Sequence, residues 1–194
     1  MTETAPVRPR DFTFIVPDDW FRIRLDEEHR KRDTDALVEL LTSKRSDRDS
    51  LGPELREMVR NMTRFVDEHT IELYLSLSKV QGFPIACSLQ VTLVEEHPDR
   101  LSPHDVVLEF VAATSSVESS SGELDGLPTG RRVRRLPARI DDQHTFDSVV
   151  VQHLLPIPAT TGFVLLDFST PLINVQEPMI GIFDAIASSF RWVW

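Results

Sequence analysis

The densest group of potential metal ligands lies near the middle of the chain, in the segment Glu95-Glu96-His97-Pro98-Asp99 and in His104 and Asp105 just after it. Imidazole and carboxylate groups are the ligands that zinc and related ions prefer. The two histidines lack the His-x-x-x-His spacing of a helical metal site, however, and the proline and charges around them are typical of an exposed turn. We therefore expect a polar turn here and no bound metal.

The residues that could act as a nucleophile or bind a phosphate form no recognisable pattern. Cys87 is the only cysteine, so no internal disulfide can form, and the apolar sequence around it predicts a buried thiol. Gly122, Gly126 and Gly130 are spaced too widely for a phosphate-binding loop, and an arginine-rich strand rather than a helix follows them. We expect no catalytic residues, no cofactor and no enzymatic activity.

His153, Asp167 and Tyr74 support an alternative interpretation. His153 lies between Val151 and Leu155 in a predicted strand, where a histidine usually forms a structural hydrogen bond in the core or at its edge. If His153 instead converged with Asp167 and Tyr74 in a cavity between sheet and helices, the three could serve a small-molecule-binding domain or a hydrolase. A deep cavity lined by these groups would favour that alternative.

A cluster of arginines stands out in a chain whose formal net charge is −10. Arg131, Arg132, Arg134 and Arg135, with Arg139 nearby, could form a docking site for an acidic partner or a phosphate group. The same charges could instead protect an edge strand from aggregation. The sequence does not decide between these interpretations. No aromatic residues interleave with the arginines to stack on bases, so we expect no nucleic acid partner.

Two tryptophans close the chain, Trp192 and Trp194. Tryptophan is enriched at the centre of protein interfaces, and it also commonly anchors a terminal segment by burial. We therefore group both with the arginine cluster as candidate partner-binding residues. Another protein is the expected partner.

The composition is that of a globular protein, with 41% hydrophobic and 27% charged residues in a length of 194. We expect a flexible tail over residues 1–10 and a single domain over 11–194. The first residues have no apolar run of the kind found in secretory signals, and no apolar segment approaches the length of a membrane span. The expected location is the cytoplasm. The excess of arginine over lysine fits a GC-rich genome, and a bacterial source is expected.

The first half of the chain predicts two strand pairs separated by helices. Residues 12–16 and 20–25 suggest a hairpin or a strand with a corner, and residues 26–69 suggest two helices, the second opened by Pro53. Its apolar stripe from Leu55 to Val66 predicts core packing, with a partner groove or a homo-oligomer contact as alternatives. Residues 71–78 and 85–94 alternate in period two and predict a hairpin at the centre of the sheet.

The second half predicts one helix, three strands and a closing helix. Ser102 and Pro103 are typical of a helix start, residues 114–126 suggest a flexible loop, and residues 130–136, 146–155 and 163–168 suggest strands. The closing helix is expected to begin near Pro178, with Asn174 and Glu177 as capping residues. Its apolar face comprises Met179, Ile182, Phe183, Ile186, Phe190 and Val193. Short connections between strands imply an α+β fold with a mostly antiparallel sheet and helices packed on its faces.

Two segments resemble the PsbP-like superfamily. The N-terminal Phe12-Thr13-Phe14-Ile15-Val16-Pro17-Asp18-Asp19-Trp20 is similar to its opening strand, proline, acidic turn and tryptophan. The C-terminal segment from Phe183 to Trp192 is similar to its closing helix. The superfamily includes photosystem PsbP proteins, a Ran-binding nuclear import factor and bacterial chaperones for secreted effectors. The resemblance implies an antiparallel sheet between helices, an α/β/α sandwich, and a binding or adaptor role. No functional residue can be carried over from it.

Together these observations favour a non-catalytic cytoplasmic protein-binding module. The resemblance implies an adaptor or chaperone, for example in a secretion or effector system. The alternatives are a small-molecule-binding domain or hydrolase with a pocket between sheet and helices, and a homo-oligomeric structural component. The sequence does not identify the partner, the pathway or the oligomeric state.

Overall fold

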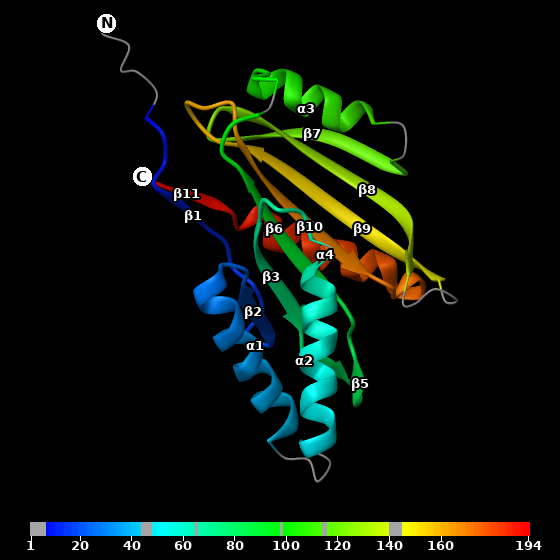
Figure 1. The fold of residues 1–194 in the computed structure, drawn as a ribbon. Helices are drawn as coiled ribbons and strands as arrows, with labels where there is room; N and C mark the ends of the chain where they lie inside the picture. The colour runs from blue at the N-terminus through cyan, green and yellow to red at the C-terminus, as the bar shows by residue number, and fades with distance from the viewer. Residues whose placement is uncertain (1–6, 44–47, 65, 98, 114–115, 140–144) are drawn as a thin grey trace, which may run out of the picture.

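The computed structural model describes residues 7–43, 48–64, 66–97, 99–113, 116–139 and 145–194 (Figure 1). Seven strands form one sheet in which each neighbouring pair is antiparallel. Their spatial order is β2 (Trp20–Arg24), β3 (Thr70–Ser76), β6 (Ser88–Val94), β10 (Phe163–Thr170), β9 (Thr145–Pro156), β8 (Leu127–Arg139) and β7 (Glu118–Leu124). The predicted α+β class with an antiparallel sheet is confirmed.

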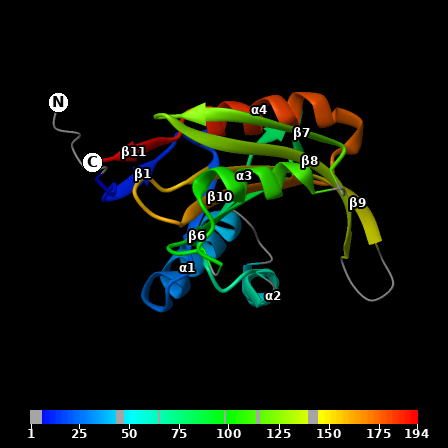
Figure 2. The same cartoon turned by 90° about the horizontal axis from the view of Figure 1, so that it is seen from above.

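Helices pack on both faces of this sheet (Figures 1 and 2). They are α1 (Glu27–Thr42), α2 (Arg48–Arg64), α3 (Pro103–Ala112) and α4 (Gln176–Ser188). Neighbouring residues of a strand point to opposite faces. Leu166 belongs to the apolar cluster that contains α4, whereas Leu165 packs in the cluster that contains α3. Helices α1 and α2 pack on Leu73, on the same face of the sheet as α3. Among the described helices, α4 alone packs on the opposite face.

Strand β10 is the centre of the fold. It alternates in burial along its whole length, and its fully buried Val164, Leu166 and Phe168 face α4. The core strand and closing helix predicted from the sequence are therefore confirmed. The hairpin predicted at the centre of the sheet, β3 and β6, does pair, but it occupies the second and third positions.

The closing helix is shorter than its apolar period suggests. It ends at Ser188, and Arg191–Val193 forms strand β11, which pairs with β1 (Asp11–Thr13) in a separate two-stranded sheet. Phe190 is nevertheless buried. The spacing of apolar residues at steps of three and four therefore correctly indicates that Phe190 is buried, although Phe190 lies after the end of the helix. The N-cap is Val175, which makes no side-chain capping bond. The predicted caps at Asn174 and Glu177 are therefore wrong.

Other boundaries also differ from expectation. Pro53 lies inside α2 instead of opening it, because the helix begins at Arg48. Strands β1 and β2 belong to different sheets and are separated by residues 14–19, which are not in a strand, so residues 12–25 do not form a hairpin. Ser102 caps α3 as predicted, its hydroxyl accepting the Asp105 N–H at 3.2 Å.

The segment predicted as a flexible loop, residues 114–126, contains strand β7. It pairs with β8 through a two-residue turn at Asp125 and Gly126, whose positive φ values of 50° and 80° fit a type I′ hairpin. Strand β8 consequently lies between β7 and β9. The interpretation of the arginine segment as an edge strand is therefore wrong, and the edge is β7.

Two small features complete the description. Strands β4 (Lys79–Val80) and β5 (Phe83–Pro84) form a short hairpin, and Ile173–Val175 is a 3-10 turn before α4. Of the predicted N-terminal tail, residues 1–6 lie outside the described residues, and residues 7–10 form neither helix nor strand. In the part of the chain that the structure describes, no helix combines the length and apolarity that crossing a bilayer requires.

Candidate functional site

Strand β8 divides the predicted arginine cluster between the two faces of the sheet. Arg131 and Arg135 point toward α4, where both line a groove. Arg132 points the other way and lies over the ring of Phe110 in α3, with its guanidinium carbon 4.1 Å from the ring centroid. Arg134 is two residues on and shares that face. The predicted cluster is therefore two separate pairs.

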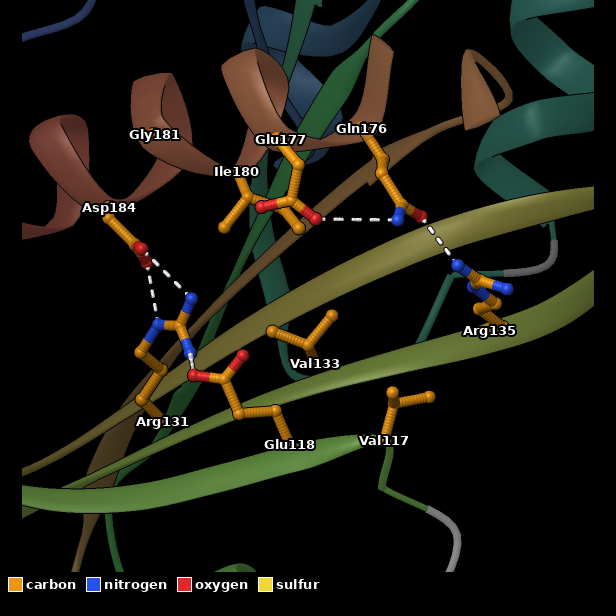
Figure 3. Close-up of a pocket in the computed structure, with 10 residues that line it drawn as sticks. All are labelled: Val117, Glu118, Arg131, Val133, Arg135, Gln176, Glu177, Ile180, Gly181 and Asp184. Atoms are coloured by element: carbon orange, nitrogen blue, oxygen red, sulfur yellow. Dashed lines mark hydrogen bonds and ion pairs between the residues drawn. The ribbon is translucent and has the colours of Figure 1, made fainter. Parts of the chain in front are cut away.

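The groove lies between β8, the start of β7 and the exposed side of α4 (Figure 3). Its volume is about 380 Å³. The residues that line it are Val117, Glu118, Arg131, Val133, Arg135, Gln176, Glu177, Ile180, Gly181 and Asp184. Its lining combines apolar side chains with charged groups of both signs.

Arg131 is held firmly on one side of this groove. Its Nε and Nη2 donate to Asp184 Oδ1 and Oδ2 at 2.8 and 2.9 Å, and its Nη1 donates to Glu118 Oε1 at 2.8 Å. His153 Nε2 lies 3.0 Å from the same Asp184 Oδ1. A bidentate arginine–carboxylate pair of this kind is geometrically specific. It ties the closing helix to β8, β9 and the edge strand.

Asp184 is the acidic centre of this network. Burial by itself would raise the pKa of its carboxyl group, but the hydrogen bonds from His153 and Arg131 outweigh burial and lower the pKa to about 2. The hydrogen bonds to Asp184 raise the pKa of the Arg131 guanidinium in turn. Both groups therefore stay charged at neutral pH.

Replacing Asp184 by asparagine is expected to reduce stability at pH 7 and to leave it unchanged near pH 2. Because the folded pKa lies below the ordinary value of 3.8, the stabilisation is present above about pH 4 and is lost as pH falls through about 2. Urea unfolding of both proteins from pH 7 to pH 2 measures the difference. A gap between the two curves that stays constant over this range would contradict the assignment.

Arg135 occupies the other side of the groove and is exposed. Its Nη2 donates to the neutral Oε1 of Gln176 at 3.0 Å (Figure 3). Val117 beside it is 68% exposed. This side of the groove therefore offers a cation and an apolar contact.

The two edge strands of the sheet, β2 and β7, differ in whether another part of the chain binds their outward backbone groups. At the β2 edge, Asp33 of α1 accepts the backbone N–H of Arg24 at 3.1 Å and also binds its guanidinium. These bonds from Arg24 outweigh burial and lower the pKa of Asp33 to about 2. At the β7 edge, six of the seven strand residues are exposed. One edge is thus capped by a side chain and the other is open.

The two terminal tryptophans have different environments. Trp192 is buried and packs edge-to-face on Phe190 and Phe12, with ring centroids 4.8 and 6.3 Å away. It anchors β11 against β1. Trp194 is 57% exposed, which leaves only this one of the two available as a surface anchor.

The three residues proposed to line a single pocket do not meet. His153 pairs with Leu166 and faces α4, whereas Asp167, the next residue of β10, faces the α3 side. Tyr74 lies on the α4 side, where its hydroxyl donates to Glu72. Burial is the main cause that raises the pKa of Tyr74. The predicted convergence is therefore wrong, because consecutive strand residues point to opposite faces.

The predicted turn at residues 95–105 carries no assembled metal site. His97 packs its ring against Phe163, and Asp105 is used in the cap of α3. Within the described ranges, no three His, Cys, Asp or Glu side chains lie together as metal ligands would. Pro98 lies outside those ranges.

The α2 stripe is partly core and partly surface. Val59 is buried with Leu37 and Leu73, whereas Met58 and Met62 line an open cleft of about 310 Å³ between α1, α2 and the sheet. Cys87 borders the cleft as a buried thiol, and burial raises its pKa. Phe65, part of the predicted stripe, lies outside the described residues.

Sequence reasoning missed the partners of the arginines, namely Asp184, Glu118 and Gln152. Asp184 is 53 residues from Arg131, so no local pattern links them. The alternation of the segment Arg131-Arg132-Val133-Arg134-Arg135 did contain one available signal. In a strand, it places the first and last arginines on one face and the middle two on the other.

Comparisons with known proteins give a similarity of fold but no match of sequence. No model of a known protein family matches the chain, and no curated protein matches its sequence. Among solved structures, the chain is similar to the solution structure of cyanobacterial PsbP from Synechocystis sp. PCC 6803. The identity is 13%, the match covers 97% of this chain and 92% of that one, and the TM-score is 0.47. That protein bears the name of the superfamily that the terminal motifs resemble. A similarity this distant concerns the fold alone.

Proposed function

We propose that this chain is a non-catalytic protein-binding module that takes an extended segment of a partner protein as an additional strand on the outer edge of β7. The observation that carries the proposal is the open state of that edge. Strand β7 is the last strand of the sheet and is exposed at all positions but its final one. Strand addition to such an edge is a recurring mode of peptide recognition.

The hydrogen-bonding groups of the edge can be placed from the hairpin. Leu124 and Leu127 flank the two-residue turn and pair with each other, so they form a hydrogen-bonded pair. Because such pairs alternate along an antiparallel ladder, Ser119, Ser121 and Glu123 direct their N–H and C=O groups away from β8. Three such residues provide up to six backbone hydrogen bonds for an incoming strand.

The side chains of β7 support the same use. The central residues Ser119-Ser120-Ser121-Gly122 are small, so another backbone can approach without steric conflict. Natural proteins usually protect an open edge with lysine, proline or a covering element, and the capped β2 edge shows one form of such protection in this chain. The contrast between the two edges supports a role for β7 in binding.

The groove beside the edge indicates which side chains the bound segment carries. Arg135 is exposed and bonds a neutral amide, and Val117 presents an apolar surface. A segment with an acidic residue and an apolar residue on its α4-facing side would complement both. We extend the proposal to an adaptor or chaperone acting in the cytoplasm, the role and the location expected from the sequence.

The test is a pair of substitutions at one outward-facing position. Extended peptides selected from a display library by the wild-type chain are titrated against Ser121→Pro, which removes an outward N–H donor, and against Ser121→Ala, which keeps it. We expect a loss of at least about tenfold in affinity for the first variant and little change for the second. In the complex, the amide protons of Ser119, Ser121 and Glu123 exchange more slowly. Equal binding to both variants would refute strand addition.

A further inference from the structure

The face of the sheet opposite the groove carries a polar row that crosses three strands. Arg132 of β8 pairs with Gln152 of β9, and Gln152 pairs with Asp167 of β10. The Gln152 side chain joins its neighbours, since its Oε1 accepts from Arg132 Nε at 2.6 Å and its Nε2 donates to Asp167. Gln152 is only 6% exposed. The row is therefore connected by hydrogen bonds and largely withdrawn from water.

Arg134 adds a second guanidinium group to this row. Its Nε is buried and has no hydrogen-bond partner within the part of the chain that the structure describes. A buried donor without an acceptor is unfavourable and commonly marks the place of a bound ion or water. Burial and the nearby charge of Arg134 lower the pKa of Arg132. The two arginines thus lie close enough to repel each other.

The carboxyl group of Asp167 interacts with both arginines, but its single charge does not balance theirs. Burial is the main cause that raises the pKa of Asp167 to about 6, and the hydrogen bond from Gln152 and the two arginines oppose it only in part. Two guanidinium groups against the single carboxyl group of Asp167 leave excess positive charge in a partly buried place. A bound anion would remove that excess and supply the missing acceptor.

We propose that Arg134 and Arg132 form a binding site for the oxyanion of a small ligand, a carboxylate or a phosphate group. Guanidinium groups present paired N–H donors in the geometry that both anions accept. The ring of Phe110 fixes the plane of the Arg132 guanidinium, and the Phe110 carbonyl oxygen accepts from its Nη1 at 3.4 Å. The site lies on the opposite face from the groove beside β7 and is independent of the function proposed above.

Asp167 gives the site a pH dependence. An anion placed beside it raises the cost of ionising the carboxyl, so binding takes up a proton and is tighter at pH 5.5 than at pH 8. The charged groups that act on Asp167 are Arg132 and Arg134 of β8. In Asp167→Asn the like charge is absent, and the affinity for acetate, which is largely ionised at both pH values, becomes nearly the same at both.

The experiment titrates the full chain with sodium acetate and, separately, with sodium phosphate, at constant ionic strength maintained with chloride. The readout is the arginine Nε–Hε region of proton–nitrogen NMR spectra, with the thermal midpoint as a second measurement. We expect saturable shifts of the Arg134 and Arg132 signals. Whichever anion produces them at lower concentration identifies the head group that the site recognises.

Two substitutions on the same strand provide the control. Arg134→Met is expected to weaken anion binding at least about tenfold, whereas Arg135→Met, which removes the same charge one residue away on the other face, leaves it unchanged within about twofold. Arg134→Lys, which keeps the charge but removes the Nε donor, serves if the methionine variant does not fold. No saturable shift with either anion, or equal weakening by the Arg134 and Arg135 substitutions, would overturn the proposal.

Discussion

Replacing Phe183 by alanine is expected to lower the free energy of unfolding by about 3 to 5 kcal/mol. Phe183 is fully buried, stacks on Phe168 with ring centroids 5.0 Å apart, and meets Trp20 edge-to-face at 6.5 Å. Truncation would remove both ring contacts and leave a cavity between α4 and β10. Because both partners are anchored in strands of the central sheet, the cavity cannot close cheaply.

Ile182, the preceding residue of the same helix, provides the control. It is 41% exposed, so Ile182→Ala is expected to change the free energy of unfolding by no more than about 1 kcal/mol. Urea unfolding of the wild type and both variants, followed by circular dichroism, measures the two effects. A similar loss in both variants would mean that α4 is not seated on β10 by the face we describe.

This part of the fold could be predicted because its signals are local. The short apolar run at 163–168 and the period of Met179, Phe183 and Ile186 lie within one segment, and each indicates an element and its buried face. The end of the helix could not be predicted in the same way. The pairing of β11 with β1 joins residues 11 and 193, and that long-range contact replaces the helical continuation that the spacing suggests.

Strand β7 was missed for a related reason. Its serines and glycine have no marked strand tendency, so the composition suggested a loop. The structure makes a strand of it because β8 provides a full ladder of partners and α3 lies beside it. The segment does contain one local signal for a strand. The pair Asp125-Gly126 is the strongest short-range indication of a two-residue hairpin, and it would have placed a strand on each side.

The candidate sites show the same division between local and distant information. The arginine cluster could be recognised from the sequence, and its separation into two pairs follows from strand alternation alone. The residues that give each pair its character come from elsewhere in the chain. Asp184 neutralises Arg131 from the closing helix, while Gln152 links Arg132 to Asp167 across the sheet. Such contacts arise from the order of the strands, which no local period encodes.

Replacing Asp167 by asparagine is expected to raise the free energy of unfolding at pH 8 by about 2 to 3 kcal/mol. The folded pKa of about 6 lies above the ordinary value of 3.8, so ionising Asp167 costs the folded state more than the unfolded state. At 1.36 kcal/mol per unit of pKa, that difference corresponds to about 3 kcal/mol. The hydrogen bond from Gln152 to asparagine is weaker than the bond to a carboxylate, which slightly reduces the expected gain in stability. The penalty is absent below about pH 4, grows as pH rises through about 6, and is constant above about 7.

Urea unfolding of Asp167→Asn and wild type at pH 4, 6 and 8 measures this profile, and Asp184→Asn provides a chemically matched control. The same substitution is expected to stabilise the chain at position 167, because burial raises the pKa of Asp167. It is expected to destabilise the chain at position 184, because bonds from histidine and arginine lower the pKa of Asp184. A residue that costs stability at neutral pH is characteristic of a binding site, where ligand contacts and not folding account for its presence. If Asp167→Asn were destabilising at pH 8, Asp167 would be an ordinary structural ion-pair partner of Arg132 and Arg134. The two arginines would then already be neutralised, and the case for an anion between them would lose its electrostatic basis.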